Sequence, residues 1–180
     1  MKLLYTLLFC LFSFTTTFAQ TTTDFIPWSA KHRLTAQDFG VKLKKETIGK
    51  AEFQLATEIR TNLYTKQKRT IVRNGLVRSK SSINPAHNVA QQLRFQQTLF
   101  DITEIYARKL RQLLPATPTA APTPTAAKTD LAAEMIAAAA KRRQQYRLQT
   151  ANSTIAAKQA QWEKTIQKEL AALQQFALPE

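Results

Sequence analysis

The sequence predicts an α+β fold, in which a small antiparallel sheet packs against a long central helix and further long helices follow. Three observations lead to this prediction. Residues 49–64 alternate apolar and polar side chains, as a half-buried strand does. Residues 84–114 carry apolar side chains three and four positions apart, as a helix with one buried face does. A segment of Pro, Thr and Ala, residues 115–127, separates these elements from an Ala- and Gln-rich helical part at 128–180.

Three segments are expected to form the sheet. Within residues 49–64, one face of the expected strand is made by Phe53, Leu55, Thr57, Ile59 and Thr61. A second strand is expected from Arg69 to Arg78, and a shorter one near Trp28–Leu34.

The central helix is expected to begin with Asn84 as its N-cap and Pro85 as its first residue, and to continue to about Leu114. An Asn side chain at the N-cap accepts a hydrogen bond from a backbone amide of the first turn. A Pro at the first helical position costs no hydrogen bond, because the amide at that position has no partner within the helix. The apolar stripe predicted to face the core consists of Phe95, Leu99, Ile102, Tyr106, Leu110 and Leu113.

Residues 115–127 contain only Pro, Thr and Ala, with four prolines within ten residues. Such a composition prevents a helix and has little to bury, so an extended, mobile linker is expected. The following helix is expected from about Asp130, with a break at Asn152–Thr154. Beyond the break, the stripe expected to pack on the central helix is Ile155, Gln159, Trp162, Ile166, Leu170 and Leu173.

The amino end has the pattern of a signal peptide. Lys2 precedes an apolar run from Leu3 to Phe14, and the small residue Ala19 stands at the expected cleavage point. We therefore expect residues 1–19 to be removed and the mature protein to be periplasmic or secreted. The apolar run is shorter than the roughly 20 residues of a spanning helix and no later run is longer, so no transmembrane segment is expected in the mature chain.

The single cysteine, Cys10, lies inside this leader. A mature chain without cysteine has neither disulfides nor thiolate metal ligands, so its stability must come from a hydrophobic core. About 160 residues are enough for one such core. Residues 20–114 and 128–180 are therefore expected to belong to the same domain.

Residues 93–102 (LRFQQTLFDI) have the outline of a zinc-protease helix from which the metal-binding side chains are missing. In the frame H-E-Q-x-H-F-D-I, two His four positions apart bind one metal, and the Glu between them activates the bound water. Phe95, Gln96 and Leu99 stand at these places. Phe and Leu have no lone pair for a cation, and an amide cannot take a proton from water, so this turn supports neither metal binding nor general-base catalysis.

The surrounding sequence resembles a family of secreted bacterial proteins of unknown function that are identified as zinc-dependent proteases. Residues 100–111 resemble the segment after the family's second His, and Ile26–Trp28 with Arg33–Gly40 resemble its opening motif. Residues 145–162 resemble a Y-D-x-x-T-x-H-G…Q-x-x-W pattern, with Asn152 in place of the His. The resemblance implies a protease-like scaffold that has lost its catalytic residues and carries no cofactor.

We therefore expect an exported, non-enzymatic pseudoenzyme with a binding or structural role in the cell envelope. One alternative is a zinc-dependent peptidase with relocated ligands, in which His87 joins Asp101 or Glu104. A catalytic zinc usually has three protein ligands held together, which weighs against this alternative. Glu104 and Arg108 are four positions apart with the acid first, and this spacing favours a surface ion pair.

A second alternative is a basic polyanion-binding envelope protein. The chain has 26 Lys and Arg against 12 Asp and Glu, a net charge of +14. Such a charge balance favours an anionic surface as the partner. The other expected partner is an unknown protein of the cell envelope. Lys141, Arg142, Arg143 and Arg147, next to Tyr146, form the candidate anion-binding cluster. A solvated helix face explains the cluster more simply, and no specific nucleic acid is expected, because further aromatic side chains are missing from it.

Overall fold

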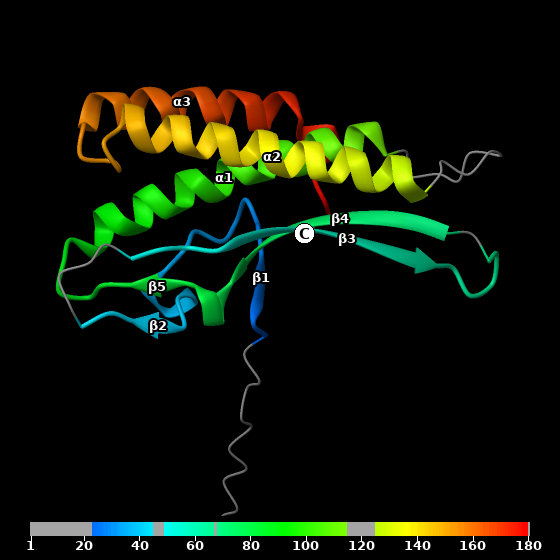
Figure 1. The fold of residues 1–180 in the computed structure, drawn as a ribbon, viewed down its shortest axis with the longest axis horizontal. Coiled ribbons are helices and arrows are strands. Elements are labelled where there is room, and N and C mark those ends of the chain that lie inside the picture. The colour runs from blue at the N-terminus through cyan, green and yellow to red at the C-terminus, as the bar shows by residue number, and fades with distance from the viewer. Residues whose placement is uncertain (1–22, 45–48, 67, 115–124, 180) are drawn as a thin grey trace, which may run out of the picture.

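The computed structural model describes residues 23–44, 49–66, 68–114 and 125–179. Over these residues the predicted α+β class is confirmed. A small antiparallel sheet is covered on one side by long helices (Figure 1). Helix α1, Val89–Leu113, contacts both long strands and both other long helices, and is the element on which the rest packs.

The three-stranded sheet has the order β1-β4-β3, with all neighbours antiparallel. Its strands are β1 (Phe25–Pro27), β3 (Phe53–Thr61) and β4 (Lys68–Val77). The two long strands agree with the predicted ones. The short strand does not lie at Trp28–Leu34 but just before it, because the backbone turns away there: the Ser29 hydroxyl accepts hydrogen bonds from the amides of Lys31 and His32.

The remaining short elements lie at the edges of the domain. They are a parallel two-stranded sheet of β2 (Val41–Lys42) and β5 (Ser82–Ile83), and the 3₁₀ turns η1 (Ala36–Asp38), η2 (Arg78–Lys80) and η3 (Gln174–Phe176). None of these short elements was predicted from the sequence.

Helix α1 begins later than predicted, at Val89, with Asn88 as its N-cap accepting from the Gln91 amide at 3.0 Å. The predicted cap, Asn84, is fully buried in the turn before the helix. Its backbone carbonyl and amide both bond to the Gln92 side chain, at 2.8 and 3.1 Å. These bonds hold Asn84 away from the helix start.

The middle of α1 is enclosed on every side, since all residues from Phe95 to Ile105 are buried. The predicted single stripe was therefore too narrow. Leu113, its expected last member, is half exposed, whereas Gln96, Asp101 and other polar residues are buried. Because polar side chains at the core need partners, the centre of α1 must be surrounded by hydrogen bonds.

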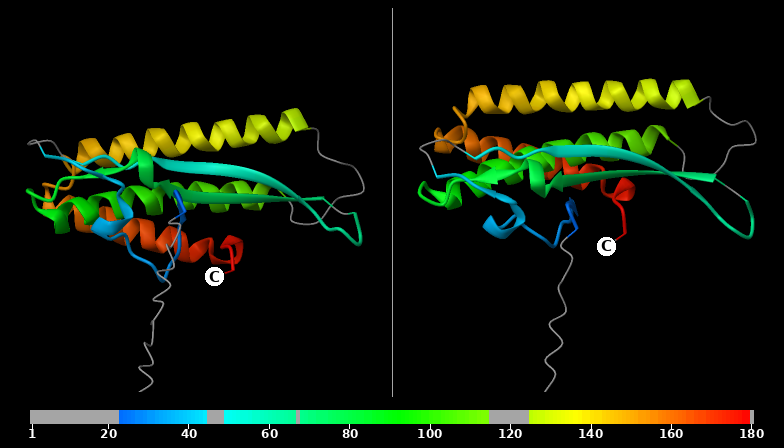
Figure 2. Two further views of the ribbon diagram at one scale, coloured as in Figure 1. Left: turned by 90° about the horizontal axis from the view of Figure 1, so that it is seen from below. Right: turned by 60° about the horizontal axis from the view of Figure 1, so that its bottom comes forward.

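Helices α2 (Thr125–Gln149) and α3 (Ala156–Ala172) run alongside α1 (Figure 2). Most of the expected linker, residues 115–124, lies outside the described residues. Its last three residues, 125–127, are not linker but the first residues of α2, which therefore begins before the expected Asp130, because they follow the last proline of the segment and Thr and Ala alone do not prevent a helix. The predicted break is confirmed: Ala151, Asn152 and Ser153 all have positive φ, a backbone conformation that ends a helix.

Helix α3 uses much of its predicted stripe. Gln159, Ile166 and Leu170 are buried and α3 contacts α1, while Ile155 is exposed. Across the described residues, no helix is long and apolar enough to span a membrane.

Candidate functional site

The positions at which the family frame has metal ligands are part of the hydrophobic core. Leu99 is fully buried, and the Phe95 ring stacks on Tyr146 with 5.4 Å between ring centroids. Gln96 is also buried, and its Nε2 donates to the Gly49 carbonyl at 2.9 Å. The prediction that Phe95 and Leu99 extend a buried face is confirmed.

Asn152, where the family has a His, lies exposed in the turn between α2 and α3. Its φ of 55° explains the residue type, because Asn adopts the left-handed region more readily than most residues. The next carbonyl, of Ser153, accepts from Gln91 at the start of α1. The turn is thereby attached to the start of α1, close to Phe95.

The relocated zinc site is not assembled. His87 precedes the first residue of α1, whereas Asp101 lies about 18 Å further along the helix at 1.5 Å per residue. Within the described parts of the chain, no three His, Cys, Asp or Glu side chains could hold a metal ion together. The other histidine, His32, pairs instead with Asp38 at 3.2 Å.

Glu104 is the centre of a buried ionic network, so the expectation of a surface pair with Arg108 was wrong. The Glu104 and Arg108 side chains are 3% and 2% exposed, with 3.1 Å between Oε1 and Nε. Arg111 contacts the same oxygen at 2.8 Å. The i, i+4 spacing predicted the contact correctly, but not that α1 is covered on that side by η3 and the end of α3.

Carbonyl oxygens hold the rest of both guanidinium groups. Arg108 donates to the Leu170 carbonyl at 2.7 Å, and Arg111 to those of Val72 and Phe176 at 2.9 and 3.0 Å. The Arg108 guanidinium also lies over the Trp28 ring. The network therefore joins α1 to β4, to the amino-terminal segment and to the carboxyl end.

Asp101 is a second buried carboxylate on α1. It accepts from the Trp28 indole and the Gln97 amide, both at 2.8 Å, while Arg33 lies 3.7 Å away. Burial raises the pKa of Asp101, and the hydrogen bonds from Trp28 and Gln97 oppose that shift only in part. Its partners fix it as a structural group that holds Trp28 against α1.

The basic cluster on α2 is divided between the interior and the surface. Arg142 forms a bidentate pair with Glu169 of α3, and Arg143 turns toward Thr103, where burial lowers its pKa. Lys141 and Arg147 remain exposed. Only part of the candidate anion-binding cluster therefore faces solvent.

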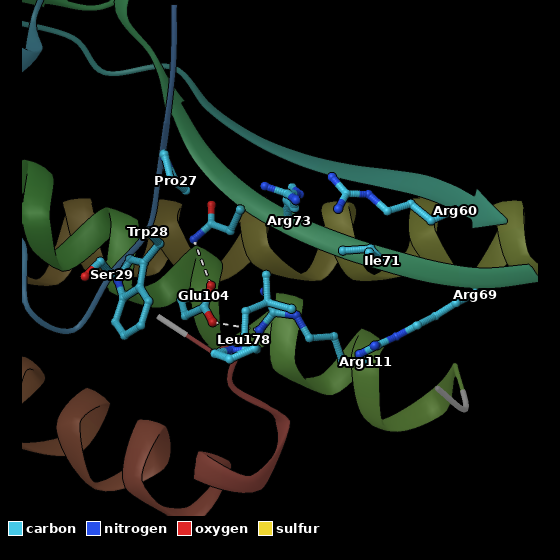
Figure 3. A pocket seen from close by; sticks show the side chains of 12 residues that line it. Pro27, Trp28, Ser29, Arg60, Arg69, Ile71, Arg73, Glu104, Arg111 and Leu178 are labelled. Carbon is cyan, nitrogen blue, oxygen red and sulfur yellow. Dashed lines mark hydrogen bonds and ion pairs between the residues drawn. The ribbon is translucent and has the colours of Figure 1, made fainter. Parts of the chain in front are cut away.

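A different group of basic residues surrounds a cavity of about 370 Å³ between β4, the second half of α1 and the end of the chain (Figure 3). We call it the arginine cavity. Its polar lining comes mainly from Arg60, Arg69, Arg73, Asn74, Glu104 and Arg111, and Trp28 and Leu178 contribute apolar surface. This cavity was not predicted from the sequence, although Arg69 and Arg73 share one strand face and Arg60 is paired opposite Arg69.

Two polar groups of the arginine cavity are incompletely satisfied. Among the described residues, the buried Oδ1 of Asn74 and Nε of Arg73 have no hydrogen-bond partner. Glu58 binds Arg60 at 2.8 Å and lies 3.6 Å from Arg73, but no ion pair within the described chain involves Arg69. A buried polar group without a partner needs a physical reason, and a bound ligand is one such reason.

Comparison of the sequence with protein-family models and with curated proteins gave no match, and comparison with solved structures gave none either.

Proposed function

We propose that the chain is an exported, non-enzymatic binding protein on a zinc-protease-like scaffold whose metal site has become part of the core. The observation that carries this proposal is the burial of Phe95, Gln96 and Leu99. Catalysis by the motif would require imidazole and carboxylate groups open to solvent and substrate at these positions.

The packing around the motif supports the proposal. The Phe95 ring contacts Tyr146, and the Gln96 amide is committed to the Gly49 carbonyl. A metal with an open position for water would need space that these side chains fill. A binding role is favoured by the arginine cavity, which agrees with the net charge of +14.

The test is the zinc content and peptidase activity of purified residues 20–180. We expect the purified protein to contain far less than one equivalent of zinc, and to show no chelator-sensitive hydrolysis of casein. The variant Phe95→His, Gln96→Glu, Leu99→His serves as a control for zinc uptake by the restored frame. Stoichiometric zinc together with chelator-sensitive hydrolysis in the native sequence would overturn the proposal, because the metal must then be held by other ligands.

A further inference from the structure

We propose that the arginine cavity binds a phosphate monoester that also carries a hydroxyl group, the chemistry of a sugar phosphate. The inference gives the proposed binding role a ligand class and rests on that role. It depends on the charge of the cavity, on one unpaired acceptor and on the size of the space.

The charge of the cavity favours an anion with more than one negative charge. Arg60, Arg69, Arg73 and Arg111 line it, and Glu104 is the one acidic residue in its described lining. Glu104 is already shared between Arg111 and the buried Arg108. Glu58, at the edge, is engaged by Arg60. With Arg108 included, five arginines face the two carboxylates and leave three positive charges in excess, and a phosphate monoester offsets more of them than a carboxylate does.

The strand register places two of these cations against each other. Arg60 and Arg69 are directly opposite in the antiparallel pairing of β3 and β4. Like charges at such positions are unfavourable, and Glu58 offsets that of Arg60 but not that of Arg69, for which the described chain shows no ion pair. Guanidinium groups are also well suited to phosphate, because each presents two parallel N–H donors to two oxygens. Figure 3 shows these arginines projecting from the hairpin, with Arg60 extending toward Arg73 and Arg69 extending toward Arg111.

Asn74 adds a requirement beyond negative charge. Its Nδ2 lies near two acceptors, the Phe100 carbonyl at 3.3 Å and Glu104 Oε2 at 3.4 Å, so the orientation of the amide is defined. The opposite atom, Oδ1, is buried without a partner among the described residues, although Asn74 lines the cavity. Oδ1 needs a donor. The phosphoryl group of a monoester dianion has none, so a hydroxyl group elsewhere on the same molecule would supply it while the phosphoryl group stays with the arginines.

The size of the space suits a small molecule. A volume of about 370 Å³ is at the lower end of the range for small-ligand sites. Ile71 and Leu178 provide apolar walls beside the polar groups. A phosphorylated monosaccharide combines these properties, with charge at one end and hydroxyl groups along a compact ring.

The experiment is calorimetric titration of residues 20–180 at low salt with glucose 6-phosphate, glucose and inorganic phosphate. We expect glucose 6-phosphate to bind at least tenfold more tightly than inorganic phosphate, and glucose to give no measurable binding. Arg69→Gln should weaken glucose 6-phosphate binding at least tenfold. Arg147→Gln, which removes an exposed arginine on α2, should change it less than twofold.

A second variant tests the hydroxyl contact separately. Asn74→Ala should remove the preference for glucose 6-phosphate over inorganic phosphate while leaving phosphate affinity within about threefold. If Asn74→Ala fails to fold, as circular dichroism would reveal, the comparison of Arg69→Gln with Arg147→Gln still decides the question. Equal losses in the two arginine variants, or equal affinity for the two phosphates, would overturn the inference.

Vesicles distinguish the two sources of this chemistry. Displacement of glucose 6-phosphate by vesicles that contain a phosphorylated glucosamine lipid, but not by vesicles of neutral lipid, would assign the site to a lipid head group. Absence of displacement would assign it to a free sugar phosphate. If the protein is free of zinc but binds none of these compounds, the sugar-phosphate inference fails and the proposed function does not. The proposed function is tested separately, by zinc content and peptidase activity.

Discussion

Replacing Glu104 by Gln should strongly destabilise the protein. The substitution keeps the side-chain volume but removes the negative charge between Arg108 and Arg111, whose side chains are 2% and 11% exposed. Breaking a buried ion pair at one partner typically costs about 3 to 5 kcal/mol, because the remaining charge stays buried without compensation. With an m-value of about 2 kcal/mol/M, the urea midpoint should fall by about 1.5 to 2.5 M.

The matched control is Glu163→Gln. Glu163 binds Arg94 with two bonds of 2.6 Å, but their side chains are 29% and 47% exposed, so solvent screens the pair. We expect a loss below about 1 kcal/mol there. The measurement is urea unfolding at pH 7 followed by circular dichroism. If Glu104→Gln shifts the midpoint no more than Glu163→Gln does, the assignment of Glu104 as the centre of the network is refuted.

Three further predictions concern the buried residues on α1 and α2. Burial raises the pKa of Asp101 above its ordinary 3.8, so ionisation of this carboxyl group destabilises the folded state as the pH rises from about 4 through the folded pKa. The loss of stability caused by Asp101→Asn should therefore be smaller at pH 7 than at pH 4, which urea unfolding at the two pH values measures. Burial also raises the pKa of Tyr146 to about 12, so Tyr146→Phe should remove only the tyrosinate absorbance that develops near pH 12; a loss at lower pH would contradict this. Phe95→His with Leu99→His should cost roughly 4 kcal/mol or more in metal-free buffer, while zinc should leave the thermal unfolding of the native sequence unchanged.

Local sequence patterns were sufficient for the elements with a strong period. The alternation around Phe53–Thr61 predicted the strand that pairs with β4. The predicted buried face is only partly buried, however: Phe53 is buried and Leu55 half-buried, whereas the members nearer the hairpin, Thr57, Ile59 and Thr61, are exposed because that end of β3 extends beyond the core. The break at Asn152 was likewise visible, because the residue types there suit the left-handed region. In both cases the determining interaction lies within a few residues.

The missed features depend on side-chain contacts that the local patterns do not show, most of them between residues far apart in the chain. Whether Asn84 or Asn88 caps α1 was decided by the Gln92 side chain, which bonds to the Asn84 backbone. The Glu104 and Arg108 pair became buried because residues more than sixty positions later, among them Leu170, cover it. The arginine cavity likewise requires the register of β3 on β4, the placement of Arg111 and the return of the carboxyl end to the sheet. No short stretch of the sequence indicates any of these three features.

The pairing of β1 with β4 has a consequence for the order in which a newly made chain folds. Ile26 pairs with Leu76, fifty positions further along, so β1 emerges well before its partner exists. The chain between these two residues must close into a loop before the contact can offset the entropy cost of closing it. A Cβ on Gly75 would lie only 2.1 Å from the Phe25 ring, so the packing of β1 on β4 also requires a residue without a side chain at position 75. The first strand to be synthesised therefore depends on one glycine and is among the last to be fixed.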